Sequence, residues 1–325
     1  MTWMTPLDFA VRYTAVLILA LIVVIFGIVA PAFLAPGSLM STLKAASFIG
    51  IAAVGMVFVL LTAGIDLSVG SAMYLAPVIA GIAMQRLGID VAPALLLCLL
   101  VGAAIGLVNA ILIVRLRIVP FIATLAMLFL VRGLGIWSTG SRQIDFPASM
   151  RAFGQSALFG IPMPVIAFAI VAAAAHIVLA HTAFGRHIYA FGNDAEAARK
   201  AGLPVRRMQA AVYVICSTCA ALAGFVLISQ IGRIDAGFGE GREFDVITAA
   251  VLGGASLFGG IGSAVSAVLG AVTVQAVKAG LVYAGVNLYL QPIVQGAIIF
   301  LAVFLDGLRA IRMEKQARRS IRPLA

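Results

Sequence analysis

Long apolar runs dominate the pattern of hydrophobic and polar positions along the chain. A helix that crosses the hydrocarbon core of a bilayer needs about 20 mostly apolar residues, whereas a membrane β-strand alternates apolar and polar positions. The run from Ala15 to Ala30 does not alternate, which favours helices. We therefore predict ten spanning helices, at residues 13–30, 46–63, 69–85, 93–114, 120–137, 164–181, 209–229, 245–260, 264–283 and 291–306.

The eighth of these helices, at 245–260, has the weakest pattern. Residues 251–262 contain five glycines, which is typical of a broken or re-entrant segment covered by protein or water. Residues 138–164 contain glycine and proline among polar positions. We expect an outer loop there, with a short helix around 149–153.

Small residues recur at every fourth position in two of the apolar runs. Gly262, Ser266 and Gly270 follow this spacing, and Gly102 and Gly106 follow it in another run. A face of small side chains allows two helices to approach closely in a membrane. We therefore predict helix packing at these positions.

The composition indicates that these helices are embedded in a membrane. Hydrophobic residues make up 63% of the chain and charged residues 10%, whereas soluble domains have about 45–50% and about 25%. We expect an all-α polytopic membrane protein with a single transmembrane domain over residues 1–325. The first apolar run is long and lacks a clear small-residue cleavage site, so we interpret it as a spanning helix rather than a signal peptide.

The lysines and arginines that give the chain its net charge of +10 lie in short loops and near the C-terminus. This distribution argues against a nucleic-acid partner. With ten spans, both termini lie on the same side. Placing them in the cytoplasm gives the inner side most of the lysines and arginines, as the positive-inside rule requires. We therefore predict a bacterial inner-membrane protein with an inner loop at about 182–208. A basic inner tail at 307–325 would also contact anionic membrane lipid.

Patterns typical of enzymes and metal sites are lacking in the sequence. Cys216 and Cys219 form a C-x-x-C pair inside an apolar run with no second pair, so we interpret them as small packing residues. The three histidines near one span end have irregular spacing, which predicts no metal site. The chain has no phosphate-binding loop sequence and no catalytic constellation. We predict that it is not an enzyme and binds no cofactor itself.

Polar residues in or between the apolar runs are candidates for a solute pathway. Asp66 lies in the segment GIDLSVGS at 64–71. A carboxylate at the bilayer centre costs at least about 2.5–3.5 kcal/mol, so Asp66 lies near the inner face or in a polar cavity. Either Asp66 or Ser68 caps the third span, or they contact the pathway or a partner surface. Other polar residues in the spans need partners and should face the bundle or a pore: Asn109, Thr124, Arg132, Gln275 and Lys278.

The largest inner loop carries the signature of a short helix. Asn193 or Asp194 can cap its start, and residues 195–201 are good helix formers with Glu196 in the first turn. Gly202 suits a left-handed stop. A helix of about two turns is too short to be stable alone, so a partner surface would complete it. An ordinary amphipathic helix on the inner surface is the alternative.

Four segments occur together in a specific order: GIDLSVGS at 64–71, PFIATLAMLFLVRGL at 120–134, GNDAEAARKAGL at 192–203 and FDVITAAVLGGASLFGGIGS at 244–263. Together they resemble the permease subunits of bacterial sugar ABC transporters of the ribose/xylose/arabinose type. The resemblance covers about residues 40–307. Two departures stand in the inner-loop segment. Phe191 precedes Gly192 where the family often has a second glycine, and Lys200-Ala201-Gly202 replaces Leu-Ser-Gly.

The resemblance implies an ABC importer permease fold for a pentose or hexose. Two permeases, identical or paired with a sister subunit, would form the pore. A separate ATPase carrying tandem cassettes would bind ATP and Mg and dock from the cytoplasm, and a periplasmic binding protein would deliver the sugar. The short inner helix would be the coupling helix. Its expected ATPase-coupling residues are Asn193, Asp194, Glu196, Ala197, Ala198 and Gly202. The expected translocation residues are Asp66, Ser68, Asn109, Thr124 and Arg132.

Two alternatives share a membrane-spanning architecture. An ABC permease for amino acids or another small polar solute would differ only in its cargo. A secondary transporter driven by an ion gradient would work without an ATPase and would more often show paired intramembrane carboxylates. Asp66 has no evident carboxylate partner in the sequence, which counts modestly against the second alternative.

Overall fold

The computed structural model describes residues 14–320; residues 1–13 and 321–325, with the end of the predicted basic tail, lie outside the described residues. The helices are α2 (Thr14–Val29), α3 (Pro36–Leu61), α4 (Val69–Leu87), α5 (Val91–Ala110), α6 (Pro120–Thr139), α7 (Ala148–Gln155), α8 (Met163–His181), α9 (Ala183–Asn193), α10 (Ala195–Lys200), α11 (Val205–Ile231), α12 (Arg242–Gly253), α13 (Ala264–Tyr283) and α14 (Gln291–Ser320). Shorter helical turns are η1 (Pro31–Leu34), η2 (Ile111–Arg115) and η3 (Leu288–Leu290). The strands are β1 (Ile144–Asp145), β2 (Ala157–Leu158), β3 (Ile161–Pro162) and β4 (Arg233–Ile234).

Six helices in the described part of the chain are long and apolar enough to cross a membrane: α3, α5 with η2, α6, α8, α11 and α13. Helix α2 and the first part of α14 are apolar but shorter. These helices identify an all-α membrane protein, as predicted. The count of ten spans and the side on which the termini lie stay predictions.

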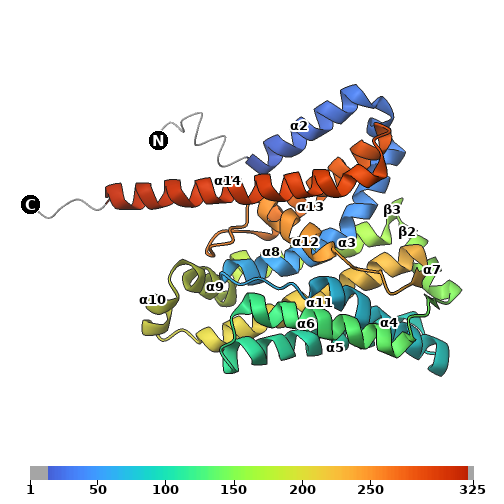
Figure 1. The fold of residues 1–325 in the computed structure, drawn as a ribbon, viewed down its shortest axis with the longest axis horizontal. Helices are drawn as coiled ribbons and strands as arrows, with labels where there is room; N and C mark the ends of the chain where they lie inside the picture. Colours follow the sequence, from blue (N-terminus) through green and yellow to red (C-terminus); the bar gives the residue numbers. More distant parts are fainter. Residues whose placement is uncertain (1–13, 321–325) are drawn as a thin grey trace, which may run out of the picture.

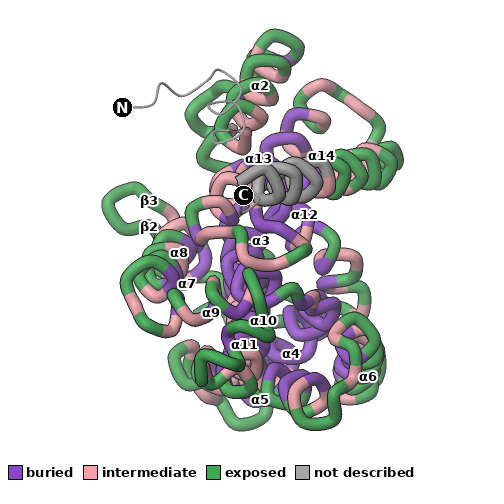
Figure 2. The backbone as a smooth tube through the Cα atoms, turned by 90° about the vertical axis from the view of Figure 1, so that its left-hand side faces the viewer, coloured by how far each residue is buried: buried purple, intermediate pink, exposed green. Residues whose placement is uncertain are grey.

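Helices α3 and α11 form the centre of the bundle. Helix α3 packs against α11, α13, α12 and α8, and α11 also packs against α5 and α4. Figure 2 shows buried residues concentrated in α3, α4, α11 and α12, whereas α2 has no buried residue and α5 and α6 each expose one side at the periphery. An exposed apolar periphery around a buried centre is what a bundle surrounded by lipid tails requires, because lipid replaces water as the solvent there.

Small residues permit the close helix contacts of the centre. A Cβ atom at Gly106 of α5 would lie 2.6 Å from the carbonyl oxygen of Tyr213 in α11. One at Gly55 of α3 would lie 2.6 Å from Cβ of Cys219 and 3.1 Å from Cα of Cys216. Both cysteines are free thiols, so their interpretation as small packing residues is confirmed. Gly106 was predicted as a packing position and Gly55 was not.

The two ends of the bundle carry different structures. At one end, the strands form two short antiparallel pairs, β1 with β4 and β2 with β3. Helix α7 lies at this end and confirms the short helix predicted around 149–153. Helices α9 and α10 lie at the opposite end, and α14 extends toward it (Figure 1).

Three predicted helix features are wrong in detail. Helix α3 begins at Pro36, ten residues before the predicted start at residue 46, since proline is well suited to a first helical position. The helix predicted at 245–260 ends at Gly253, because Gly254 adopts a left-handed φ of +118°, and this end confirms the break indicated by the glycines of residues 251–262. Gly262 precedes α13 and lies on no helix face, although Gly270 packs against Ala249 as predicted.

Candidate functional site

The helix predicted in the inner loop is α10. Asp194 precedes it, and its Oδ1 accepts hydrogen bonds from two backbone N–H groups of the first turn, each at 2.9 Å. Asp194 rather than Asn193 is therefore the N-cap. Gly202 has a φ of +79°, which suits the predicted left-handed stop. Helix α10 has six residues and is about 9 Å long, slightly shorter than predicted.

Helix α10 has one buried face and one exposed face. Ala198 packs with Phe191 of α9 and Met208 of α11 in a small hydrophobic cluster. Glu196 and Lys200 form an exposed ion pair of 2.9 Å, which contributes little to stability because water screens both charges. The structure thus turns Ala198 inward, so it is not part of the exposed face of α10. The other predicted coupling residues are exposed: Asn193, Asp194, Glu196, Ala197 and Gly202.

Three of the predicted pathway residues meet in one buried cluster. Asp66 lies in the loop between α3 and α4, and its Oδ1 accepts hydrogen bonds from the Ser68 backbone N–H at 2.9 Å and the Ser68 hydroxyl at 2.6 Å. Asn109 of α5 donates to the Ser68 hydroxyl at 2.9 Å. Ser217 of α11 donates to Asp66 Oδ2 at 3.4 Å. All four side chains are fully buried, so the cluster joins the α3–α4 loop to α5 and α11.

The capping interpretation of this segment is wrong. No side chain caps α4, because Asp66 accepts hydrogen bonds from the Ser68 residue that precedes the helix rather than from its first turn. Thr124 of α6 supports the same loop, since its hydroxyl donates to the carbonyl oxygen of Ile65 at 3.2 Å. The loop is thus fixed from three helices, and a role of these residues in translocation stays a prediction.

Arg132 of α6 lies apart from this cluster. Its guanidinium donates hydrogen bonds to the carbonyl oxygens of Ala236 and Phe238 and lies 5.0 Å from the ring centroid of Tyr74. Arg132 therefore ties α6 to the segment that links β4 to α12. Nearby, Glu243 has a buried Oε2 atom without a hydrogen-bond partner among the described residues.

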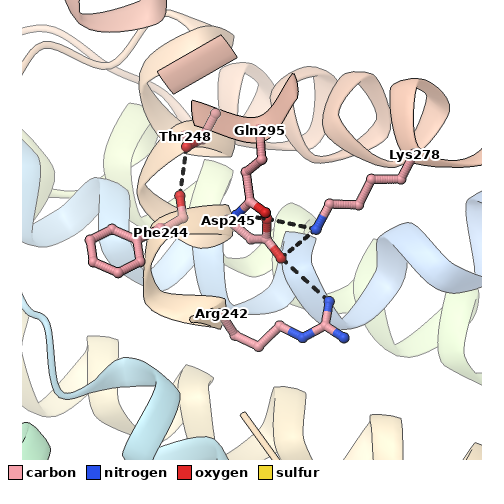
Figure 3. A network of polar contacts seen from close by, with 6 residues as sticks. All are labelled: Arg242, Phe244, Asp245, Thr248, Lys278 and Gln295. Carbon is pink, nitrogen blue, oxygen red and sulfur yellow. Dashed lines mark hydrogen bonds and ion pairs between the residues drawn. The ribbon is translucent and has the colours of Figure 1, made fainter. Parts of the chain in front are cut away.

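Another buried carboxylate, Asp245, lies in the first turn of α12 (Figure 3). Lys278 of α13 donates to its two oxygens at 2.7 and 2.6 Å. Gln295 of α14 donates to Oδ1 at 2.7 Å, and Arg242 to Oδ2 at 3.3 Å. The Arg242 guanidinium also lies 5.4 Å from the ring centroid of Phe48. Asp245 thus joins three helices through charged and amide donors.

This network borders an open cleft of about 930 Å³. Its walls are formed by most of residues 235–242, the first turn of α12, one face of α13, the start of α14, Phe48 of α3 and the end of α11. The cleft is mixed in character, because Phe238 and Phe244 lie beside Glu240, Lys278 and several amide side chains. A cleft that combines apolar walls with a few placed polar groups is the usual form of a small-molecule site.

The sequence reasoning missed the pairing of Asp245 with Lys278. Lys278 and Gln275 were predicted to face the bundle or a pore, and both line the cleft. Asp245 was not among the predicted site residues, although it is only 2% exposed. A lysine inside an apolar run requires an acceptor, and this requirement was the available signal. It did not identify Asp245, which lies 33 residues earlier in the chain.

Comparisons with known proteins agree on one family. A family model described as a branched-chain amino acid transport system permease component matches residues 38–303. The ribose import permease protein RbsC of Escherichia coli K12 is 36% identical over 294 residues, covering 89% of this chain and 91% of that protein. No solved structure matches the chain.

Two further relatives carry other names. The fructose import permease protein FrcC of Rhizobium meliloti is 34% identical over 300 residues, covering 89% of this chain and 83% of that protein. The autoinducer 2 import system permease protein LsrC of Yersinia enterocolitica is 37% identical over 281 residues, covering 84% and 78%. The chain is about equally similar to permeases that are named for different cargos. The comparisons therefore identify the class of protein but not the cargo.

Proposed function

The chain belongs to the sugar ABC importer permeases, and from this premise we propose that it carries a monosaccharide across the bacterial inner membrane. The cargo is a pentose or hexose delivered by a periplasmic binding protein. A separate ATPase with tandem cassettes binds ATP and Mg and drives transport. This chain contributes the membrane path, as a dimer with itself or with a sister permease. The relatives named ribose and fructose import permeases support the sugar class.

The observation that carries the proposal is the form of α10. Six residues are too few for a helix that is stable alone, yet α10 is capped at its start and anchored through Ala198. Its remaining residues are exposed, including Glu196, Ala197 and Lys200. A rigid, exposed helix of this kind suits insertion into a groove of another protein. We assign that groove to the ATPase, whose closure would move α10 and switch the path between inward- and outward-facing states.

The proposed arrangement has ten spans with both termini in the cytoplasm. Helices α2 and α14 supply the first and last spans, and α12, too short to cross alone, is completed by the segments on either side of it. The cleft beside Asp245 forms the entrance for the sugar, since its carboxylate, amide and cationic groups match sugar hydroxyls. Thiol labelling of single cysteines at Ala157 and Ala197 tests the arrangement, with reaction expected from the periplasm and the cytoplasm respectively.

Purification in mild detergent followed by reconstitution is the direct test. An ATPase with two cassettes is expected to co-purify with the chain. Proteoliposomes that contain both proteins should take up ribose or fructose only when ATP and the binding protein are supplied. Uptake by vesicles that contain the chain alone would contradict the proposal and favour an ion-gradient transporter.

The role of α10 is tested by a bulky substitution on its exposed face. Ala197→Trp should reduce sugar uptake about tenfold, the effect of losing about 1.4 kcal/mol of binding to the ATPase. The matched control is Ala152→Trp, because Ala152 is an exposed alanine on α7, a short helix at the opposite end of the bundle. Normal uptake by Ala197→Trp, or equal loss in both variants, would remove α10 from the coupling surface.

A second candidate cargo is an amino acid, which the description of the matching family model favours. The transport subunit would then be the same, and only the ligand of the binding protein would differ. Calorimetric titration of the cognate binding protein with ribose, fructose and leucine separates these cargos. Binding of leucine without binding of either sugar would replace the sugar proposal.

A further inference from the structure

The loop between α12 and α13 is rich in glycine and contacts two other segments. One is the end of α3, which leads to Asp66, and the other is the end of α9, which leads into α10. We call residues 254–263 the glycine loop; it joins α12 to α13. The backbone N–H of Gly260 donates to the carbonyl oxygen of Leu61 at 3.0 Å. Leu61 is the last residue of α3, and its carbonyl has no partner within the helix. Gly192, near the end of α9, packs against the same carbonyl and against Gly260.

This three-way contact is possible only without side chains. Gly259 and Gly260 have left-handed φ angles of +91° and +71°, which strain any residue with a Cβ atom. A Cβ atom at Gly260 would also collide with the Oδ1 atom of Asn193. Asn193 directly precedes the cap of α10. The glycine loop therefore lies at contact distance from Gly192 and Asn193, which lead into α10 and which we call the coupling segment.

Two side chains from other helices hold the glycine loop in place. Asp306 of α14 is buried, and its Oδ2 accepts hydrogen bonds from the Leu257 backbone N–H at 3.0 Å and the Ser256 hydroxyl at 3.3 Å. The Tyr189 hydroxyl of α9 donates to the carbonyl oxygen of Gly262 at 2.7 Å. A glycine-rich loop is ordinarily among the most mobile parts of a protein. Hydrogen bonds near both of its ends restrain this one.

The other end of the same unit lies at the cleft. Helix α12 has 12 residues and is about 18 Å long. Its C-terminal end continues into the glycine loop, and its first turn carries Arg242 and Asp245, which line the cleft. Because Asp245 is bonded to Lys278 and Gln295, a displacement of α12 would change the shape of the cleft wall. One short helix thus spans the distance between the coupling segment and the cleft.

We propose that the glycine loop and α12 form a lever that carries the movement of α10 to the cleft, with Asp306 and Tyr189 as its positioning residues. The lever rests on the proposed function, since it presumes that α10 is moved by an ATPase. It adds a second route for that movement beside direct contact of α10 with α9 and α11. Without one of these hydrogen bonds, the loop would deform when α10 moves and would displace α12 less. ATP hydrolysis would then continue, but the cleft would change its shape less in each cycle.

The test measures sugar molecules imported per ATP hydrolysed by the assembled complex in proteoliposomes, with ribose and fructose as probes. Asp306→Ala should lower this ratio about tenfold, because a hydrogen bond to a charged group is worth about one factor of ten or more. Asp306→Asn keeps an acceptor oxygen and should stay within about twofold of the wild type. A purely structural role of Asp306 would lower the amount of assembled complex and leave the ratio of the remainder unchanged.

A matched glycine pair provides the second arm. Gly260→Ala should lower the ratio, whereas Gly285→Ala should not. The two positions have nearly equal φ angles, +71° and +70°, but a Cβ atom at Gly285 meets nothing within 4 Å. The backbone strain is therefore matched, and only the contact with the coupling segment differs.

The outcomes separate the lever from the function on which it rests. No ATP-driven uptake by the wild-type complex would contradict the proposed function. Wild-type uptake together with an unchanged ratio in assembled Asp306→Ala or Gly260→Ala complexes would overturn the lever alone. If neither variant assembles, Tyr189→Phe decides the matter, because it removes only one hydroxyl. An unchanged ratio in that variant would then overturn the lever.

Discussion

Asp66 and Asp245 are both buried carboxylates, but their surroundings differ. Asp66 is bonded by the neutral groups of Ser68, Asn109 and Ser217, and it has no salt bridge to the described residues. Asp245 is bonded by Lys278 and Arg242 as well as by Gln295. The first carboxylate lies inside close packing, whereas the second borders an open cleft.

The difference separates two tasks. Neutral donors around Asp66 fix the α3–α4 loop without a counter-charge, which suits a structural joint among three helices. A carboxylate with two cations at a cleft wall retains unused N–H donors on those cations, because Lys278 has three donors and Arg242 has five. These donors are available to a solute that enters the cleft. We therefore expect solute contact at the Asp245 network, whereas the predicted role of Asp66 in translocation stays a prediction.

The largest expected effect is on the Asp245 network. Lys278→Met leaves buried Asp245 with the amide of Gln295 and with Arg242, whose side chain is 37% exposed and lies 3.3 Å away. Removing one partner of a buried ion pair costs about 3 kcal/mol, which thermal unfolding of the purified protein in detergent would report. The double variant Lys278→Met with Asp245→Asn removes both charges and should recover most of this loss. Equal stability of the single variant and the wild type would show that the pair contributes nothing.

A smaller loss is expected at Asp66. Asp66→Ala leaves the donors of Ser68 and Ser217 without an acceptor, at a cost of about 2 kcal/mol. Asp66→Asn retains one acceptor oxygen and leaves no cation unpaired, so it should cost less than half as much. The same unfolding measurement ranks the two variants. An asparagine as damaging as the alanine would mean that the negative charge itself has a partner, and the contrast with Asp245 would fail.

The sequence predicted the local features of both regions and missed their partners. The spans, α7 and α10 follow from apolar runs, glycines and one capping carboxylate, all of which act over a few neighbouring residues. The partner of Asp66 in α11 lies 151 residues away, and nothing within the segment at 64–71 specifies it. The sequence alone therefore does not decide whether Asp66 pairs with neutral hydroxyls or with a second charge.

The early start of α3 and the early end of α12 have the same physical origin. The average hydrophobicity of a run identifies the part of a helix that lies in lipid, whereas single residues determine where the helix begins and ends. Pro36 starts α3 within a polar stretch that the apolar pattern leaves out. Gly254 ends α12 inside a stretch that the pattern includes. Helix ends in this protein thus follow backbone chemistry, whereas helix centres follow hydrophobicity.

The smallest expected effect distinguishes the two regions by their response to salt. Arg242 is 37% exposed on its side chain and donates one long hydrogen bond to Asp245, so Arg242→Gln should cost only about 0.5 kcal/mol. Raising the salt concentration to about 1 M shortens the screening length to about 3 Å and should abolish that small difference. The Asp66→Ala loss should persist in the same salt, because water and ions do not reach a fully buried cluster of neutral donors. A salt-sensitive loss at Asp66 would mean that ions reach its carboxylate, and the cluster would then belong to a hydrated path like the cleft at Asp245.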